Sequence, residues 1–342
     1  MNFTDIFGQD EALSVLHRAL ASDRLPHGLL LAGPMGVGKG TIARLLARRL
    51  LCEAPINAEP CNHCHSCNLC IAETHPDLHI VYRQLIRLTK SDVKAREIVA
   101  DVIRDYVLAP AGLRTVMGRG KVFIIEEAEL MNTAAQNALL KTLEEPSPGT
   151  TIILLTHRPG DLLPTIRSRC QLVQFARLPE HAVRRQIEQR GYSSETALKA
   201  TQLADGSLGQ ALRWIEDGVI EQASVLIDLL DELWQGRISA TRVADFFKPA
   251  IDAYAERQLG RDKLGSKDQA SRDGIAIYLS IAAAHFARKL RDGIDPDALE
   301  RACRAIDALV DSERYVDANV NAQLVYLQLS SALRRARPIA TR

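Results

Sequence analysis

The stretch that decides the fold reads Gly28-Leu29-Leu30-Leu31-Ala32-Gly33-Pro34-Met35-Gly36-Val37-Gly38-Lys39-Gly40-Thr41. An apolar run at residues 28–32 leads into the pattern GxxxxGK at residues 33–39, and residues 41–51 have the apolar periodicity of a helix. Glycines let backbone N–H groups point inward around phosphate oxygens, and the N-terminus of the next helix adds partial positive charge. The stretch therefore predicts a strand, a phosphate-binding loop whose Lys39 reaches the outer phosphates, and a helix. A glycine-rich turn without a ligand is the weaker alternative.

Strands and helices alternate along the first half of the chain, which predicts a parallel sheet covered by helices on both faces, the α/β class. Beyond Pro179 we find no convincing strand, and a polar stretch at residues 260–273 predicts a loop within a helical pattern. The strands are expected at residues 28–32, 121–125 and 151–155, and the helices of the first half at residues 11–22, 41–51, 92–108 and 132–145. The expected domains are residues 1–177 with a cysteine-rich insert at 52–70, residues 178–218, and residues 219–342.

The residue after Lys39 is unusual for a loop that hydrolyses ATP. That position is normally Ser or Thr, whose hydroxyl binds Mg²⁺. Here it is Gly40, which has no side chain, and Thr41 follows. Thr41 or a water could take over the role, so binding of ATP and Mg²⁺ stays open while efficient hydrolysis is not expected.

An acidic pair follows the apolar run at residues 121–125. It is Glu126-Glu127, at the predicted carboxyl end of a strand. An acid in this place can hold Mg²⁺, and the next one can polarise a water, as in a Walker B strand. The alternative is a solvated acidic turn after a core strand.

Five of the seven cysteines lie within residues 52–70, and the last four of them are spaced three residues apart. Two residues between cysteines allow two thiolates to bind one tetrahedral zinc, and four thiolates make a closed, structural site. Cys52 and Cys70 both qualify as the fourth ligand beside the other three, and Cys52 is favoured because it comes from a second chain segment. The candidate donors are Cys52, Cys61, Cys64, Cys67 and Cys70, with His63 and His65 as further possibilities.

Composition excludes some classes of protein. Lys and Arg (43) nearly cancel Asp and Glu (42), so bulk charge does not favour tight binding of nucleic acid. The segment Met1–Asp5 lacks the basic and apolar regions of a secretory signal, and no apolar run reaches the ~18–20 residues that span a bilayer. We therefore expect a cytoplasmic protein without membrane contact, in which clustered thiols indicate metal rather than disulfides.

Several segments together resemble the bacterial clamp-loader subunits of DNA polymerase III, a family of AAA+ proteins. The resemblance covers most of residues 1–215 and is weaker beyond them. Its most specific part contains Ser168-Arg169-Cys170, a hallmark of clamp loaders. The segments that carry it are Phe3-Thr4-Asp5-Ile6-Phe7-Gly8-Gln9, Arg24-Leu25-Pro26-His27-Gly28, Thr74-His75-Pro76-Asp77, Asn137-Ala138-Leu139-Leu140-Lys141-Thr142-Leu143-Glu144-Glu145-Pro146 and Leu163-Pro164-Thr165-Ile166-Arg167-Ser168-Arg169-Cys170-Gln171.

The resemblance implies a P-loop AAA+ domain, then a small helical lid and an all-helical C-terminal collar that forms oligomers. It implies that Arg169 is an arginine finger acting in trans, and that Thr156 occupies the sensor 1 position that orients water. It also implies structural zinc (Zn²⁺) on Cys52, Cys61, Cys64 and Cys67, with Cys70 free. The nucleotide-binding candidates are Gly33, Gly36, Gly38, Lys39, Gly40, Thr41, Glu126, Glu127 and Thr156.

The resemblance also bears on activity. Gly209 stands where motor subunits carry the sensor 2 arginine, and Gly40 lacks the hydroxyl, so both indicate a stator with little turnover of its own. Such a subunit would supply Arg169 to a neighbouring ATPase subunit, so that the sliding clamp is loaded on primed DNA during replication. The implied partners are the gamma/tau and delta subunits, the beta sliding clamp and primer-template DNA.

Two other functions remain in competition. A gamma/tau-like motor subunit that hydrolyses ATP shares the fold, and turnover by the isolated chain would distinguish it. A nucleoside monophosphate kinase is supported by the Lys39-Gly40-Thr41 ending alone, which adenylate kinases share. The helical C-terminus and the segment around Arg169 have no place in such a kinase.

Overall fold

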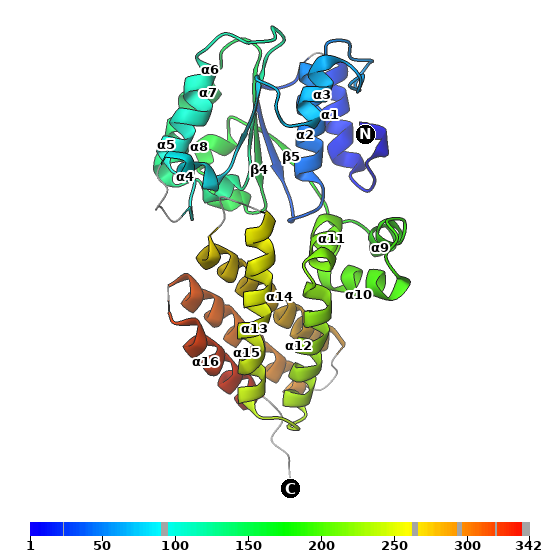
Figure 1. Cartoon of the computed structure of the whole chain (residues 1–342), viewed down its shortest axis with the longest axis vertical. Coiled ribbons are helices and arrows are strands. Elements are labelled where there is room, and N and C mark those ends of the chain that lie inside the picture. The colour runs from blue at the N-terminus through cyan, green and yellow to red at the C-terminus, as the bar shows by residue number, and fades with distance from the viewer. Residues whose placement is uncertain (23, 90–94, 262–265, 293–295, 319, 337–342) are drawn as a thin grey trace. The chain divides into compact units, whose positions relative to one another are not determined.

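The structure is a computed structural model that describes residues 1–22, 24–89, 95–261, 266–292, 296–318 and 320–336 (Figure 1). The chain divides into two compact units. The first comprises Met1–Tyr192 and Ala204–Gln210, and the second comprises Ser193–Leu203 and Ala211–Arg342. The division into three domains with boundaries after residues 177 and 218 stays a prediction.

The first unit is built on a parallel sheet of five strands in the order β2-β3-β4-β1-β5. The predicted strands at residues 28–32, 121–125 and 151–155 are confirmed as β1, β3 and β4. Two further strands, β2 and β5, were not predicted from the sequence, because each is short and mixes polar with apolar residues. The strands are β1 (Gly28–Ala32), β2 (Leu78–Val81), β3 (Lys121–Ile125), β4 (Thr150–Thr156) and β5 (Gln171–Gln174).

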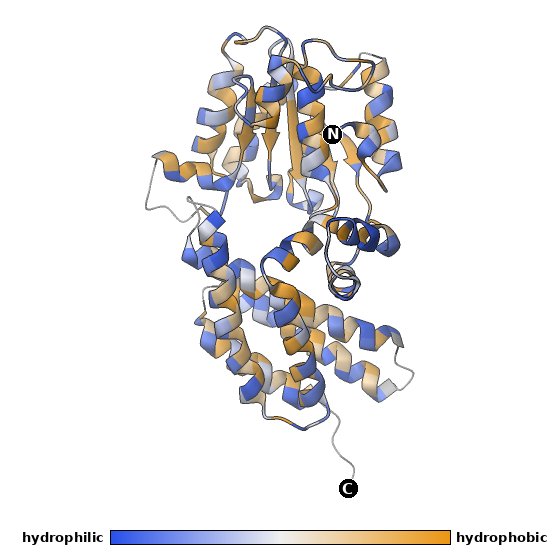
Figure 2. Cartoon of the chain, turned by 45° about the vertical axis from the view of Figure 1, so that its right-hand side comes forward, coloured by the Kyte–Doolittle hydropathy of each residue, from blue (hydrophilic) through white to orange (hydrophobic). Residues whose placement is uncertain are grey.

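Alternate side chains of the central strands enter two separate hydrophobic cores, one on each face of the sheet. Leu29 and Leu31 pack into one core, whereas Leu30 packs into the other. The central strands are accordingly largely apolar, while the surrounding helices have one apolar and one polar side (Figure 2). The first core holds α1 (Asp10–Ala21) and α2 (Lys39–Leu51), and the second holds α5 (Ala100–Ile103) and α7 (Thr133–Glu144).

The predicted helices of this unit are found with small changes. Asn132 caps α7, because its side-chain oxygen accepts the N–H of Ala135 at 2.9 Å, and the helix ends before Pro146. The helix predicted at 92–108 is wrong over residues 95–99, where Ile98 pairs as an isolated bridge with Met131. Residues 92–94 lie outside the described residues. Helical structure begins at α5 and continues through a π-helical segment, η3 (Arg104–Leu108), into α6 (Ala109–Ala111). The other short elements are η1 (Phe3–Asp5), α3 (His65–Ile71), η2 (Arg83–Leu85), α4 (Ile86–Thr89), η4 (Ala128–Leu130), η5 (Pro159–Asp161) and α8 (Pro164–Arg167).

Every described element beyond Pro179 is a helix, as predicted. The loop predicted at residues 260–273 is wrong at both ends, since helix α13 runs to Arg261 and helix α14 begins at Lys267. Residues 262–265 lie outside the described part of the chain. Polar residues there form the solvent side of a helix rather than a loop. The helices are α9 (Glu180–Glu188), α10 (Ser194–Ala204), α11 (Leu208–Glu216), α12 (Val219–Trp234), α13 (Ala240–Arg261), α14 (Lys267–Asp292), α15 (Pro296–Asp317) and α16 (Ala322–Ala336).

Aromatic side chains join the long helices of the second unit. Phe246 of α13 meets Tyr278 of α14 edge-on, with ring centroids 5.6 Å apart, and the neighbouring Phe247 stacks on Tyr326 of α16 at 4.9 Å. Tyr278 is fully buried. Within the described residues, no helix has both the length and the apolar character needed to cross a membrane.

Candidate functional site

The predicted phosphate loop follows β1 and closes on α2. Gly33 has φ 151°, and a Cβ there would lie 2.3 Å from the carbonyl oxygen of Phe175. Gly36 has φ 69°, and a Cβ there would lie 2.2 Å from Ser207 Oγ. Glycine is therefore required at both positions, by the backbone conformation and by the lack of space.

Lys39 is buried at the start of α2, and its ammonium group is held by the loop itself. Its Nζ donates to the carbonyl oxygens of Gly33 at 2.6 Å and Pro34 at 2.5 Å. Burial lowers the pKa of Lys39 from its ordinary 10.5 to about 8, although the negative charge of Glu129 acts in the opposite direction. A phosphate group would compete with these two carbonyls for the lysine.

Gln9, the last residue of a segment that resembles clamp-loader subunits, holds the loop in place. Its side-chain amide donates to the carbonyls of Val37 at 3.2 Å and Ala176 at 2.8 Å, and its oxygen accepts the N–H of Ala176. The side chain is buried, and the hydrogen bond to Val37 is shielded from water, whereas the two to Ala176 are partly buried. Gln9 therefore ties the tip of the loop to the segment after β5.

The start of α11 packs directly against the loop. The N–H of Gly209 donates to the carbonyl oxygen of Gly36 at 2.8 Å, and a Cβ on Gly209 would lie 2.9 Å from that oxygen. Ser207 caps the helix, since its Oγ accepts the N–H of Gln210 at 3.2 Å. A side chain at position 209 would have to displace the loop backbone, so glycine permits the contact between α11 and the loop. Glycine also means that no cationic side chain extends from this position.

The acidic pair lies at the end of β3, and ion pairs hold both of its carboxylates. Glu126 Oε1 lies 2.8 Å from Arg44 Nη2, and Glu127 Oε2 lies 3.2 Å from Arg83 Nε. Glu127 has a left-handed backbone with φ 49°. Thr41 is exposed on the first turn of α2. These side chains flank the loop, but the acids are paired with arginines.

Glu129, which was not predicted, is the most deeply buried carboxylate beside the loop. It forms an ion pair with His157. Burial by itself raises the pKa of Glu129, but the neighbouring side chains of His157 and Thr156 outweigh it and leave the pKa below its ordinary value. The sequence offered one signal, since Glu129 is the third acid within four residues.

Thr156 ends β4 next to both Glu129 and the loop. It is buried, its carbonyl oxygen accepts the N–H of Gly33 at 3.2 Å, and its Oγ1 accepts the N–H of Arg158 at 3.1 Å. The structure therefore puts the predicted sensor residue at the base of the phosphate loop, where it also contacts a buried carboxylate.

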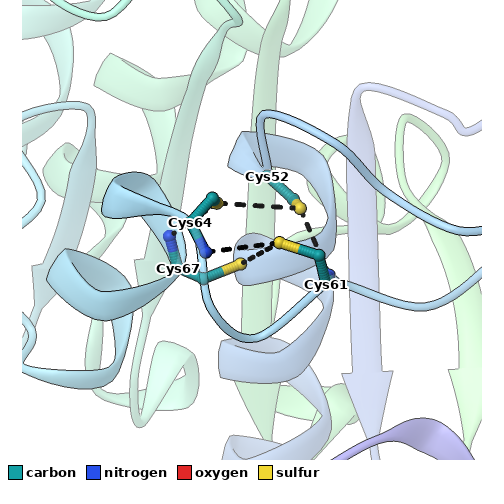
Figure 3. Close-up of side chains that lie close together, drawn as sticks. All are labelled: Cys52, Cys61, Cys64 and Cys67. Carbon is teal, nitrogen blue, oxygen red and sulfur yellow. Dashed lines mark hydrogen bonds between the residues drawn. The ribbon is translucent and has the colours of Figure 1, made fainter.

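Four of the clustered cysteines converge on one point (Figure 3). The sulfur atoms of Cys52, Cys61, Cys64 and Cys67 all lie within 4.8 Å of one another. The Cys52–Cys64 sulfur distance is 4.0 Å and the Cys61–Cys67 distance is 3.9 Å. Tetrahedral coordination with metal–sulfur bonds of about 2.3 Å separates sulfurs by about 3.8 Å, so this arrangement fits a single metal ion.

Backbone N–H groups point at these sulfurs and favour thiolates. The N–H of Cys61 donates to Cys52 Sγ at 3.3 Å, and the N–H of Cys67 donates to Cys64 Sγ at 3.3 Å. A hydrogen bond from the backbone of His63 is the main cause that lowers the pKa of Cys61 to about 6. Burial instead raises the pKa of Cys67.

The alternative ligands lie outside this group. Cys70 is buried in the core of the sheet face that holds α2, and burial raises the pKa of its thiol to about 11. The side chain of His63 bonds the carbonyl of Cys61 through Nδ1 at 2.7 Å. Among the described residues, neither Cys70 nor His63 or His65 joins the four sulfurs.

A buried hydrogen-bond chain joins the cysteine module to the sheet. Ser66 Oγ donates to the carbonyl of Leu51 at 2.6 Å and meets His75 Nε2 at 2.9 Å. His75 Nδ1 accepts the N–H of Asp77 at 3.0 Å, so the ring is neutral with its proton on Nε2, and burial lowers the pKa of His75 accordingly. The Asp77 carboxylate accepts the N–H groups of Val116 and Met117, both at 2.8 Å.

Arg169 lies after α8, away from the loop residues described above. Its Nη2 lies 2.5 Å from Glu144 Oε1, and its Nη1 donates to the carbonyl of Thr165 at 3.0 Å. Its neighbour Cys170 is buried in the core, whereas the Arg169 side chain is about one-third exposed (34%). The guanidinium therefore sits at the surface, held by a carboxylate of the same chain.

Comparison with known proteins matches this chain to subunits of DNA polymerase III. The family described as "DNA polymerase III, delta subunit" matches residues 8–179. The chain is 36% identical over 222 residues to DNA polymerase III subunit delta' of Pseudomonas aeruginosa. The aligned part covers 64% of this chain and 65% of the Pseudomonas protein. The chain is 27% identical over 320 residues to subunit delta' of Bacillus subtilis, which covers 92% of this chain and 93% of that one. It is 34% identical over 264 residues to DNA polymerase III subunit tau of Escherichia coli, which covers 75% of this chain and 39% of tau. The chain thus spans just under two thirds of the Pseudomonas relative and a smaller part of tau.

Proposed function

Because the chain belongs to the DNA polymerase III delta subunit family, we propose that it is the delta-prime subunit of a bacterial clamp loader. In this role it is a stator: it helps a neighbouring subunit hydrolyse ATP and turns over little ATP itself. The observation that carries the stator role is that the phosphate loop keeps its glycines and Lys39, while Gly40 after the loop and Gly209 in α11 stand at two positions that hydrolysis uses.

The surroundings of the loop support this role. Gly40 has no hydroxyl for Mg²⁺, and the first acid after β3, Glu126, is paired with Arg44. Gly209 carries no cation, and a Cβ at this position would lie 2.9 Å from the Gly36 carbonyl oxygen, so any side chain there would have to displace the loop backbone. An active P-loop ATPase needs a metal ligand on the loop and a free acid at the strand end.

Arg169 is the group that this chain would supply to a neighbour. A guanidinium near the transferred phosphoryl group neutralises developing charge, and such fingers contribute on the order of 10³–10⁵ in rate. The exposure of Arg169 at the surface supports a role outside its own chain. The neighbour would be a gamma/tau subunit, and the complex would include the delta subunit, the beta clamp and primer-template DNA.

The four-cysteine group is proposed to bind one zinc ion. Its donors are all sulfur, which zinc accepts in closed tetrahedral sites, and the sulfur separations fit that geometry. Cys52, Cys61, Cys64 and Cys67 would be the ligands. With every position taken by a thiolate, the ion would hold the module together and perform no chemistry.

A gamma/tau-like motor is the alternative with the same fold, and tau relatives match three quarters of this chain. The test is reconstitution. This chain should co-purify with the gamma/tau and delta subunits, and adding it should raise the ATPase of the complex on primed DNA. A chain that fails to assemble, or that hydrolyses ATP as fast alone as in the complex, would contradict the stator.

A further inference from the structure

Arg44 lies on α2 one helical turn after Gly40, and its guanidinium reaches back to the end of β3. Nη2 lies 2.8 Å from Glu126 Oε1, and Nε lies 2.6 Å from Glu73 Oε1. Nη1 faces Gly40: it is 3.5 Å from the Gly40 carbonyl oxygen and 3.2 Å from the place that a Cβ would take. The guanidinium of Arg44 therefore lies between the residue after Lys39 and the first acid at the end of β3.

Position 40 and Glu126 are the two places from which a hydrolysing P-loop protein holds Mg²⁺. In this chain they do not fit the ion. Gly40 offers no side-chain oxygen, and one carboxylate oxygen of Glu126 is already paired with Arg44. A divalent cation entering between them would have to displace a group of the same charge sign.

Gly40 and Arg44 also fit each other sterically. A contact of 3.2 Å between a Cβ and a nitrogen is tighter than most, so Ser or Thr at position 40 would crowd the guanidinium. A Ser at position 40 would require the Arg44 guanidinium to shift by a few tenths of an ångström, and Glu126 would still have this guanidinium as its partner.

We propose that Arg44 takes the place of the divalent cation, so that this loop holds nucleotide phosphates without Mg²⁺. The phosphates would be bound by loop N–H groups, by Lys39 and by Arg44 Nη1. This is the guanidinium nitrogen that faces Gly40. A guanidinium donates to phosphate oxygens in a planar fork and stays charged throughout the physiological range. The inference rests on the proposed function, since it describes the nucleotide site of a subunit that does not hydrolyse ATP.

The test is the affinity of the full-length chain for ADP, measured by calorimetry with Mg²⁺ and again with a chelator. The wild-type dissociation constant should agree within about twofold between the two conditions. Arg44→Gln should weaken binding in chelator by about tenfold or more, which corresponds to about 1.4 kcal/mol. The double variant Gly40→Ser with Arg44→Gln should bind ADP about tenfold more tightly with Mg²⁺ than without it.

Arg49→Gln is the matched control, because this arginine lies on the same helix and donates to the carbonyl of Asn57. It should keep the wild-type affinity in both conditions. Arg44→Lys retains a cation and should stay independent of Mg²⁺, which separates charge from any folding defect of Arg44→Gln. A wild-type affinity that rises tenfold with Mg²⁺, or no ADP binding in either condition, would overturn the proposal. Assembly with gamma/tau is measured separately, so neither result bears on the clamp-loader assignment.

Discussion

Arg169 Nη2 lies 2.5 Å from Glu144 Oε1, an ion pair between the segment after α8 and the last residue of α7. Both side chains are partly exposed, and exposed pairs of this kind contribute at most about 1 kcal/mol. The pair is therefore weak enough to open when a phosphate group of another subunit competes for the guanidinium. Glu144 would orient the Arg169 side chain without preventing the guanidinium from binding another group.

Replacing Arg169 with Ala should leave folding and assembly intact and abolish the contribution of this chain to a neighbouring site. Clamp loading on primed DNA should fall strongly, while total ATPase falls only in part because other motor sites keep turning. Both activities are measured on a complex reconstituted with wild-type partners.

Glu144→Ala provides the control, because it removes the local partner and leaves the guanidinium in place. This variant should load clamps about as well as wild type. If Arg169→Ala assembles normally and matches wild type in both activities, Arg169 is not the finger. Loss of assembly in both variants would instead indicate a structural ion pair.

Metal content tests the cysteine assignment. Protein purified without chelator should contain about one zinc ion per chain, as a closed thiolate site requires. Cys64→Ser should lose the ion and unfold at a lower temperature, because the module is then without one of its four ligands. Cys70→Ser should retain it, since Cys70 lies outside the four-sulfur group. Full zinc content in Cys64→Ser would disprove the assignment.

Gly209→Ala should destabilise the first unit by about 1–3 kcal/mol, the usual cost of overpacking. The added Cβ would lie 2.9 Å from the Gly36 carbonyl oxygen, and a backbone oxygen cannot move away cheaply. Urea unfolding measures the change. Gly260→Ala is the control, because a Cβ on Gly260 meets nothing within 4 Å. Equal stability of the two variants would mean that the contact between α11 and the loop is not tight.

Nucleotide affinity should depend on pH through Lys39. Its pKa is lowered to about 8, and only the protonated form attracts phosphate, so affinity should be constant below that pH and fall above it. The dissociation constant of ADP is measured from about pH 6.5 to about pH 9.5. Lys39→Arg stays charged over this range and should show a flatter profile. A wild-type affinity that is unchanged up to pH 9.5 would show that the ammonium is not perturbed or does not bind the phosphates.

The isolated chain should show weak or no ATP turnover, with or without DNA, and Gly40→Thr should not raise it, because Arg44 still engages Glu126. Phosphate release from purified protein is the measurement. Turnover at roughly 1 per second or faster, which is within the usual enzyme range, would favour the motor subunit.

The central strands and their helices were predictable because their signals are local. An apolar run before a glycine pattern requires only neighbours in sequence, and so does the periodicity of α2 and α7. Strands β2 and β5 have no such signal: β5 reads Gln171-Leu172-Val173-Gln174 and is recognisable as a strand only once it pairs with β1. The first part of the helix predicted at 92–108 failed for a similar reason, since Ile98 pairs with Met131 instead.

Sequence by itself determined the phosphate loop, the absence of a hydroxyl at Gly40 and the spacing of the cysteines, because each depends on residue type and short separation. Only the tertiary structure decided which groups face them. Arg44 reaches Glu126 across 82 residues, Gly209 meets Gly36, and His157 meets Glu129. The reason is physical: the charge and space around a side chain are set by residues that folding brings close, and these lie far away along the chain.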